Sequence, residues 1–323
     1  MLAPSHDQIS QKLLEHKRPW RECDRFFACY ERTKELISPK PVDISKFLAA
    51  FLKTPALFAI GPEAFAAGIV RSAAMLGITQ EQFIRAGLRV PRLFYKKPET
   101  LADNIARSAK LIGVSKRALT HAALKHPNHF EATPEKLVKH VETSAALLKL
   151  TRKQFVQMAM KQPSLLAMRP KTLAANVTDS AKFLQLTPAQ FLKAALRLPS
   201  LLYQKPQTLL SNARGSATQL GLSLAEFKGA ILNHPQLISR KPSTLAANME
   251  GAAKLLDLTP KQFMRLALKY PRWLCHKPAT IARMFADMAK QRGMSTKKLM
   301  EAALKKPTLL CRAPYPRARV ATK

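Results

Sequence analysis

Several features that define enzyme and membrane-protein classes are missing from this sequence. No apolar run approaches the roughly 18 residues that a membrane-spanning helix needs. The four cysteines have neither disulfide-framework nor metal-ligand spacing, and Cys275 and Cys311 lie 36 residues apart. There is no glycine-rich phosphate loop, no His/Cys metal set and no nucleophile motif. We therefore expect no enzyme activity, no cofactor, no metal and no membrane partner.

Acidic residues are also scarce. The chain has 20 Asp and Glu against 54 Lys and Arg, a net charge of +34. Such a balance favours a polyanionic partner, most often nucleic acid and less often an anionic membrane. The hydrophobic content of 47% is ample for a continuous core.

Proline is abundant and regularly spaced. Pairs of prolines separated by six residues recur every 36 residues without an insertion. Fixed self-similarity at this period is typical of a repeat array, in which each unit packs on its neighbours. The first prolines of the pairs are Pro55, Pro91, Pro127, Pro163, Pro199, Pro235, Pro271 and Pro307. The second are Pro62, Pro98, Pro134, Pro170, Pro206, Pro242, Pro278 and Pro314.

Each repeat predicts two helices and a short turn. In residues 242–277, apolar residues with helical spacing follow Pro242, which suits the first turn of a helix. Ser or Thr then opens a second helix, with Gln or Glu three residues later in five repeats as a capping box. Pro271 ends that helix, and "PRWL" is long enough for a 3₁₀-like turn. We expect equivalent leucines, such as Leu196 and Leu268, to share a core layer.

The predicted fold is all-α, a right- or left-handed α-solenoid of seven 36-residue repeats in residues 62–313. A half repeat at 42–61 and a helical cap at 1–41 precede it, and a basic tail at 314–323 follows. No cleavable signal peptide is evident, and the four acidic residues between Asp7 and Asp24 argue against a mitochondrial transit peptide. The localisation stays open between cytoplasm or nucleoid and, for a secreted effector, a host nucleus.

Basic residues recur at fixed repeat positions and predict phosphate contacts. The repeat region holds 41 basic and 13 acidic residues, and eight of the acids lie in the first ten positions of a repeat. The bases concentrate on the second helix and the turn, so equivalent positions would form continuous rows along a solenoid. A solvated face would instead show mixed signs. The first basic row, two residues before the first proline, is Arg89, Lys125, Lys161, Arg197, Lys269 and Lys305. The second basic row, just before the second proline, is Lys97, Arg169, Lys205, Lys241 and Lys277.

The residue after each first proline varies between repeats and is a candidate for base readout. Arg, Asn and Gln can pair bidentately with guanine or adenine edges. A variable residue beside a constant phosphate row is what a one-repeat, one-base reader needs, whereas neutral drift in an exposed loop would give the same variation. These post-proline positions are Arg92, Asn128, Ser164, Ser200, Gln236, Arg272 and Thr308.

The repeat resembles a known family. The segments "LGITQEQFIRAGLRVPRLF" and "LDLTPKQFMRLALKYPRWL" look like the repeat of mitochondrial transcription termination factors (mTERF-type), over residues 42–313. The resemblance implies a curved α-α-3₁₀ solenoid whose basic concave face binds double-stranded DNA or RNA in organelles, although that family has a less regular period. The segment "LTPAQF" is also similar to TAL-effector arrays, whose glycine-rich inter-helix loop is missing here.

These observations predict a monomeric protein that binds nucleic acid, with double-stranded DNA favoured over RNA, and that regulates gene expression. Two alternatives stay open: an RNA-binding or ribosome-associated solenoid, and a protein–protein scaffold for an acidic partner.

Overall fold

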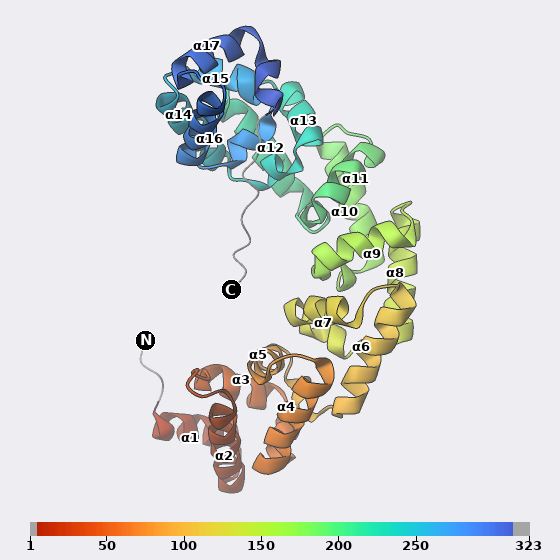
Figure 1. Cartoon of the computed structure of the whole chain (residues 1–323). Coiled ribbons are helices and arrows are strands. Elements are labelled where there is room, and N and C mark those ends of the chain that lie inside the picture. The colour runs from red at the N-terminus through yellow and green to blue at the C-terminus, as the bar shows by residue number, and fades with distance from the viewer. Residues whose placement is uncertain (1–4, 313–323) are drawn as a thin grey trace. The chain divides into compact units, whose positions relative to one another are not determined.

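The computed structural model describes residues 5–312, and within that range every regular element is helical, with no strand (Figure 1). Contacts between residues divide the chain into two compact units, the first ending at Lys171 and the second beginning at Thr172. The all-α solenoid expectation is confirmed, because helices pack in consecutive pairs along each unit. The predicted tail at 314–323 lies outside the described residues.

The first unit begins with two helices of the predicted cap and then the half repeat. Helix pairs follow, each closed by a 3₁₀ helix. The elements are α1 (His6–Glu15), α2 (Trp20–Ile37), α3 (Ile44–Lys53), η1 (Pro55–Ala59), α4 (Pro62–Leu76), α5 (Gln80–Arg89), η2 (Pro91–Tyr95), α6 (Pro98–Ile112), α7 (Lys116–Lys125), η3 (Pro127–Phe130), α8 (Pro134–Leu147), α9 (Arg152–Lys161) and η4 (Pro163–Leu166).

The second unit repeats the same order, and its first helix starts two residues before the boundary. Its elements are α10 (Pro170–Phe183), α11 (Pro188–Arg197), η5 (Pro199–Leu202), α12 (Pro206–Gln219), α13 (Leu224–Asn233), η6 (Pro235–Ser239), α14 (Pro242–Leu255), α15 (Pro260–Ala267), η7 (Pro271–Cys275), α16 (Pro278–Gln291), α17 (Thr296–Lys305) and η8 (Pro307–Arg312). We call the even-numbered helices from α4 to α16 the first helices and the odd-numbered helices from α5 to α17 the second helices.

The predicted helix boundaries are confirmed by their caps. The second prolines from Pro62 to Pro278 lie at the N-termini of the first helices, while Pro314 lies outside the described residues. The predicted capping boxes form at α5, α9, α11, α13 and α15, where a Ser or Thr side chain and a Gln or Glu side chain satisfy each other's backbone N–H groups. Each first helix from α4 to α16 is followed by a residue of positive φ. These residues are Gly77, Gly113, Lys149, Gln185, Gly221, Asp257 and Gly293.

Consecutive first helices pack on one another: α4, α6 and α8 in the first unit, and α12, α14 and α16 in the second. The cap helix α2 packs on α4 in the same way. A fully buried phenylalanine lies in each of α5, α9, α11, α13 and α15. The expectation for the leucine near the end of the second helix is wrong, because Leu196 and Leu268 are only half-buried. Leu196 lies on the last turn of α11, and Leu268 directly follows the end of α15.

A recurring amide, which the sequence analysis overlooked, ties three first helices, α10, α12 and α14, to the 3₁₀ helix of the same repeat. The side chain of Asn176 donates to the Leu202 carbonyl at 3.0 Å, and Asn248 donates to that of Leu274 at 2.9 Å. Asn212 makes the equivalent bond to Ile238 at 3.0 Å. These asparagines recur every 36 residues, and this recurrence in the sequence could have predicted a shared structural role.

Candidate nucleic-acid interface

The first basic row lies at the C-termini of the second helices. Five of its six residues are the last residue of their helix, while Lys269 lies two residues after the end of α15. All six side chains are exposed, and none forms an ion pair with a carboxylate among residues 5–312. A cation at this end offsets the negative end of the helix dipole, so part of this row has a structural role.

The two arginines of the first basic row also link adjacent second helices. The Arg89 guanidinium donates to the Lys125 carbonyl at 2.9 Å, and the Arg197 guanidinium donates to the Asn233 carbonyl at 3.2 Å. These carbonyls are among the last four of a helix, which have no partner within it. A guanidinium has five N–H donors, so donors remain for a phosphate after these bonds.

The second basic row lies at the opposite kind of helix end. Lys97, Lys205, Lys241 and Lys277 are the N-cap residues of first helices, and none provides a side-chain cap. Arg169 directly precedes α10, and all five residues of the row are exposed. A cation at a helix N-terminus is unfavourable, because the dipole is positive there and lysine cannot accept from the free N–H groups.

α8 shows the arrangement that helix stability favours at this position. Its N-cap is Thr133, whose hydroxyl oxygen accepts from the backbone N–H of Lys136 at 3.4 Å. Helix stability therefore does not explain why basic residues occupy the second basic row. A position where local preference is broken repeatedly is expected at a functional surface.

The post-proline positions do not share one environment. Asn128, Gln236 and Thr308 are exposed, whereas Ser200 and Arg272 are half-buried. Ser164 is only 8% exposed, and its hydroxyl accepts a hydrogen bond from the Gln162 side chain at 2.7 Å.

Arg92, the first of these positions, is exposed but lies 3.3 Å from the carboxylate of Glu131 on the next turn of the array. The pattern in the sequence could not show this pairing, because Glu131 is 39 residues away.

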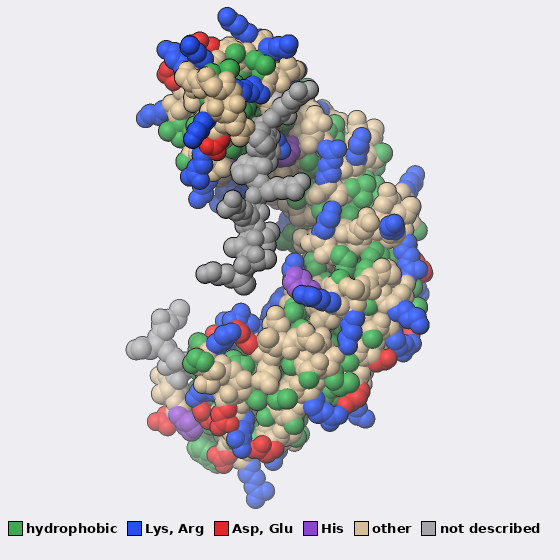
Figure 2. All heavy atoms as spheres, in the orientation of Figure 1, with side chains coloured by type: hydrophobic (Ala, Val, Ile, Leu, Met, Phe, Trp, Pro, Cys, Tyr) green, Lys and Arg blue, Asp and Glu red, His purple; other side chains and the backbone are tan. Residues whose placement is uncertain are grey.

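Further cations extend along the second helices. Arg85, Arg117, Lys153, Lys193 and Arg265 are exposed on the same helices as the first basic row, and Arg85 pairs with Glu81 at 2.7 Å. Lysine and arginine side chains are accordingly spread over the second helices on the face seen in Figure 2.

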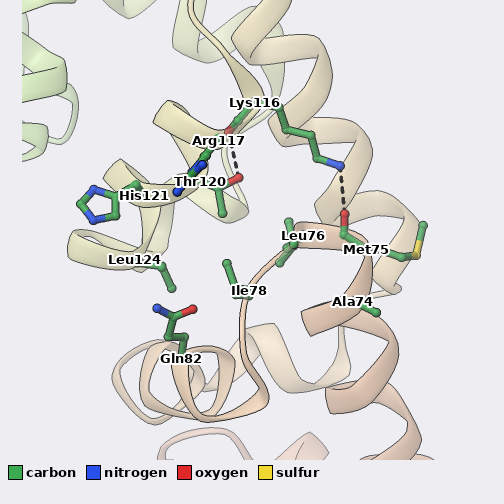
Figure 3. Close-up of a pocket in the computed structure, with 11 residues that line it drawn as sticks. Ala74, Met75, Leu76, Ile78, Gln82, Lys116, Arg117, Thr120, His121 and Leu124 are labelled. Atoms are coloured by element: carbon green, nitrogen blue, oxygen red, sulfur yellow. Dashed lines mark hydrogen bonds between the residues drawn. The ribbon is translucent and has the colours of Figure 1, made fainter. Parts of the chain in front are cut away.

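Open grooves lie between the end of one first helix and the next second helix. The groove between α4 and α7 has a volume of about 540 Å³ and is lined by Met75 and Ile78 on one side and Arg117 and His121 on the other (Figure 3). The Lys116 ammonium closes one end by donating to the Met75 carbonyl at 2.9 Å. Equivalent grooves lie between α6 and α9, with about 950 Å³, and between α12 and α15, with about 730 Å³.

Two histidines of the first unit contact backbone carbonyls of the 3₁₀ helix η4. His129 is 5% exposed, and its Nε2 lies 3.1 Å from the Pro163 carbonyl oxygen. Burial lowers the pKa of His129 to about 4, so the ring is neutral and donates through Nε2. His140 makes an equivalent 3.1 Å contact with the Leu165 carbonyl, and burial also lowers its pKa. These rings hold η4 in place.

In residues 5–312, no group of three or more His, Cys, Asp or Glu side chains could hold a metal ion. No helix in this range is long and apolar enough to cross a membrane. No protein-family model matches the chain, and no curated protein sequence matches it either.

Proposed function

We propose that this protein binds double-stranded nucleic acid, DNA in preference to RNA, through phosphate contacts made by the two basic rows, and that it acts in the regulation of gene expression. The observation that carries the proposal is the second basic row: lysines occupy helix N-caps where they weaken the helix. A polymer of regularly spaced phosphates explains why cations recur there.

The two rows flank the 3₁₀ helices in the chain, one ending the second helix and the other opening the next first helix. At η2, η4, η5 and η7 a cation of one row thus precedes the 3₁₀ helix and a cation of the other row follows it. The exposed aromatic side chains in the described range are few, namely Trp20, Tyr95 and Tyr203. Single-strand binders rely on successive aromatic platforms, so this composition favours a duplex.

Base readout is proposed only for the exposed, uncharged post-proline residues Asn128, Gln236 and Thr308. Arg92 is neutralised by Glu131, and the Ser164 hydroxyl is already bonded inside the protein. Most of the affinity is then independent of sequence, because phosphate contacts position the polymer and do not specify bases.

The test replaces second-row lysines by threonine, the residue that α8 has at this position. The variant Lys205→Thr, Lys241→Thr, Lys277→Thr should be more stable, by about 0.5 to 1 kcal/mol per site, because each helix gains a cap. It should bind duplex DNA more weakly, and the log–log salt slope should fall by about 0.9 per site.

Lys254→Thr, which replaces an exposed lysine in the last turn of α14, is the control that removes a charge without adding an N-cap. The full control carries Lys254→Thr and two further substitutions that each remove an exposed lysine outside the two basic rows. If this control and the triple variant lose equal affinity, the effect comes from net charge alone and the second basic row has no specific role.

A second candidate function, docking of an acidic protein segment, is favoured by the grooves. Their walls combine exposed apolar side chains, such as the 47% exposed Leu111, with cations such as Lys153. A synthetic peptide of alternating glutamate and leucine should bind, and Leu111→Ser should weaken it without affecting duplex binding. A peptide with serine in place of leucine separates this mode from simple charge attraction.

A further inference from the structure

The groove between α6 and α9 is bordered by large apolar side chains that solvent reaches. Leu111, near the C-terminus of α6, is 47% exposed, and Val114, two residues after that helix ends, is half-buried. α9 contributes the buried Val156 and the half-buried Met160. The groove has a volume of about 950 Å³ and lies within the first unit. Exposed apolar side chains that gather in one concave place are typical of a binding site.

The exposed leucine of this groove recurs at one position of the 36-residue period. Single exposed apolar residues are normal on a protein surface, but core packing does not explain an exposed one that recurs at the same place. In the groove between α12 and α15 the position is taken by Gln219, so that wall is polar. The exposed members are Met75 at 38%, Leu111 at 47%, Leu147 at 46% and Leu255 at 55%.

The face of α9 that lines the groove combines apolar and basic residues. Lys153, Val156, Met160 and Lys161 lie at helical spacing, so they share one face of the helix. Both lysines are exposed, and neither forms an ion pair with a carboxylate in residues 5–312. Their Cα atoms are eight residues apart, which is roughly 12 Å along a helix. Two cations thus flank the apolar centre of the groove.

The neighbouring carboxylate is already engaged elsewhere. The Arg152 guanidinium lies 3.7 Å from the carboxylate of Glu142 and donates a hydrogen bond to the Leu111 carbonyl. This arginine closes the end of α6 and takes the nearby negative charge with it. A ligand of the groove must therefore bring its own anions to Lys153 and Lys161, together with apolar side chains for the centre.

These demands select one class of occupant. A second copy of this chain is unsuited, because a net charge of +34 makes two such basic surfaces repel each other. An extended peptide would find no strand edge within residues 5–312, so its backbone N–H and C=O groups would be buried without partners. A helix satisfies its own backbone, and it can place apolar residues on one face with carboxylates on the flanks.

We propose that the α6–α9 groove binds an acidic amphipathic helix of a partner protein. Its apolar side chains pack on Leu111 and Met160, and its carboxylates pair with Lys153 and Lys161. This deepens the second candidate function by naming the groove and the form of the partner. Lys161 also belongs to the first basic row, so the bound helix removes a phosphate contact and competes with a duplex. The competition rests on the proposed function, whereas the docking of the helix does not.

The first experiment compares two labelled peptides with equal numbers of glutamate and leucine. In the first peptide, pairs of leucines alternate with pairs of glutamates, so the leucines gather on one face of a helix. In the second peptide, single residues alternate, so the leucines are spread around the helix. Fluorescence anisotropy with the full chain should show that the first binds about tenfold more tightly. Equal affinities would mean attraction by charge alone and would overturn the proposal.

A matched pair of variants locates the binding site. Leu111→Ser should weaken binding of the first peptide by about tenfold, because the exposed half of the leucine can no longer be buried by the ligand. Leu255→Ser makes the same change at the same repeat position in α14 and leaves the α6–α9 groove intact, so it should bind the peptide as the parent does. If the two variants lose affinity equally, the α6–α9 groove is not the site.

The second experiment measures duplex DNA affinity at fixed salt, with and without enough of the first peptide to occupy the parent protein. The peptide should reduce duplex affinity by roughly three- to tenfold, the share of one phosphate contact and of the added negative charge. The reduction should be much smaller in Leu111→Ser at the same peptide concentration. An unchanged duplex affinity in the parent would overturn the competition.

The two experiments separate this proposal from the proposed function. If the first peptide binds in a Leu111-dependent way but no duplex is bound, the docking of the helix stands and the proposed function falls. If duplex DNA is bound but peptide binding does not depend on Leu111, the helix proposal falls and the proposed function stands.

Discussion

The two units join their successive first helices in different ways. In the first unit the joints are ion pairs that cross from one first helix to the start of the next. Arg107 of α6 lies 2.8 Å from Glu135 of α8, and Arg71 of α4 pairs in the same way with Glu99 of α6. α2 uses the same device, since its Arg32 lies 2.6 Å from a carboxylate at the start of α4.

In the second unit the residue equivalent to Arg71 is Gly215 in α12 and Gly251 in α14. A Cβ at Gly215 would lie 3.0 Å from the Pro242 ring, and one at Gly251 would lie 2.7 Å from the Pro278 ring. The proline that opens each next first helix therefore packs directly on the glycine. In α12 and α14 this close contact between glycine and proline takes the place of the ion pair seen in the first unit.

The difference extends to the charge of each unit. Residues 1–171 hold 29 Lys and Arg against 14 Asp and Glu, while residues 172–323 hold 25 against 6. Within residues 5–312, all ion pairs of Lys or Arg with a carboxylate fall between Arg18 and Arg152. Acidic side chains in Figure 2 accordingly gather around the N-terminal helices. The first unit neutralises part of its own charge through these ion pairs.

The largest expected effect concerns the buried phenylalanines of the second helices, which both units have. Phe155→Ala in α9 and Phe227→Ala in α13 each remove a fully buried ring, so each should cost about 3 to 5 kcal/mol of unfolding free energy. Leu196→Ala, at a half-buried position, should cost about 1 kcal/mol. Hydrogen exchange should localise each loss to the unit that carries the change. A loss at Leu196 as large as at the phenylalanines would restore the expected core layer.

Acid should destabilise the first unit through His129. Its folded pKa of about 4 lies below the ordinary value of 6.5 that it has in the unfolded chain. The unfolded state therefore binds a proton first, so this stability is complete above about pH 6.5 and is lost as pH falls toward 4. We expect a loss of about 3 kcal/mol, measured by chemical denaturation.

The variant His129→Asn separates this effect from the titration of carboxylates. Its amide can still donate to the Pro163 carbonyl but cannot be protonated in this range. The acid-induced loss should be smaller in this variant, and an identical pH profile in both proteins would remove His129 as the cause.

Changing the glycine joint should affect only the second unit. Gly251→Val places atoms against the Pro278 ring, so it should cost about 1 to 3 kcal/mol. Gly229→Ala in α13 is the control, because its Cβ meets nothing within 4 Å, and it should stabilise by about 0.5 to 1 kcal/mol. Thermal melting of both variants measures the contrast. A stable Gly251→Val protein would show that the close contact is not the joint.

The ion-pair joint should have the smallest effect. Arg71→Gln and Arg107→Gln remove pairs between exposed side chains, so each should cost about 0.2 to 1 kcal/mol at low salt. Added salt should remove the difference from the parent, because exposed charges are screened. The comparison is made on the first unit by hydrogen exchange. A cost that persists at high salt would mean that the arginines act through packing.

The period in the sequence was enough to predict the repeated helix pair and its boundaries. Proline disfavours a helical residue before it and suits the first turn of a helix that begins at it. Thr259 and Gln262 form the capping box that begins α15. These preferences depend on neighbouring residues only, so they can be identified without a structure. Even the non-glycine residues Lys149 and Asp257 adopt positive φ where glycine predominates in other repeats.

The sequence predicted which positions carry the candidate residues, but it did not predict how buried each side chain is or which residue it pairs with. The sequence by itself determined the helical repeat, the caps and the periodic placement of basic residues. Only the tertiary structure decided that Ser164 is buried and that Arg92 is paired with Glu131. The physical reason is distance along the chain: caps form between residues three or four apart, whereas Arg92 and Glu131 are 39 residues apart and meet only when neighbouring turns stack.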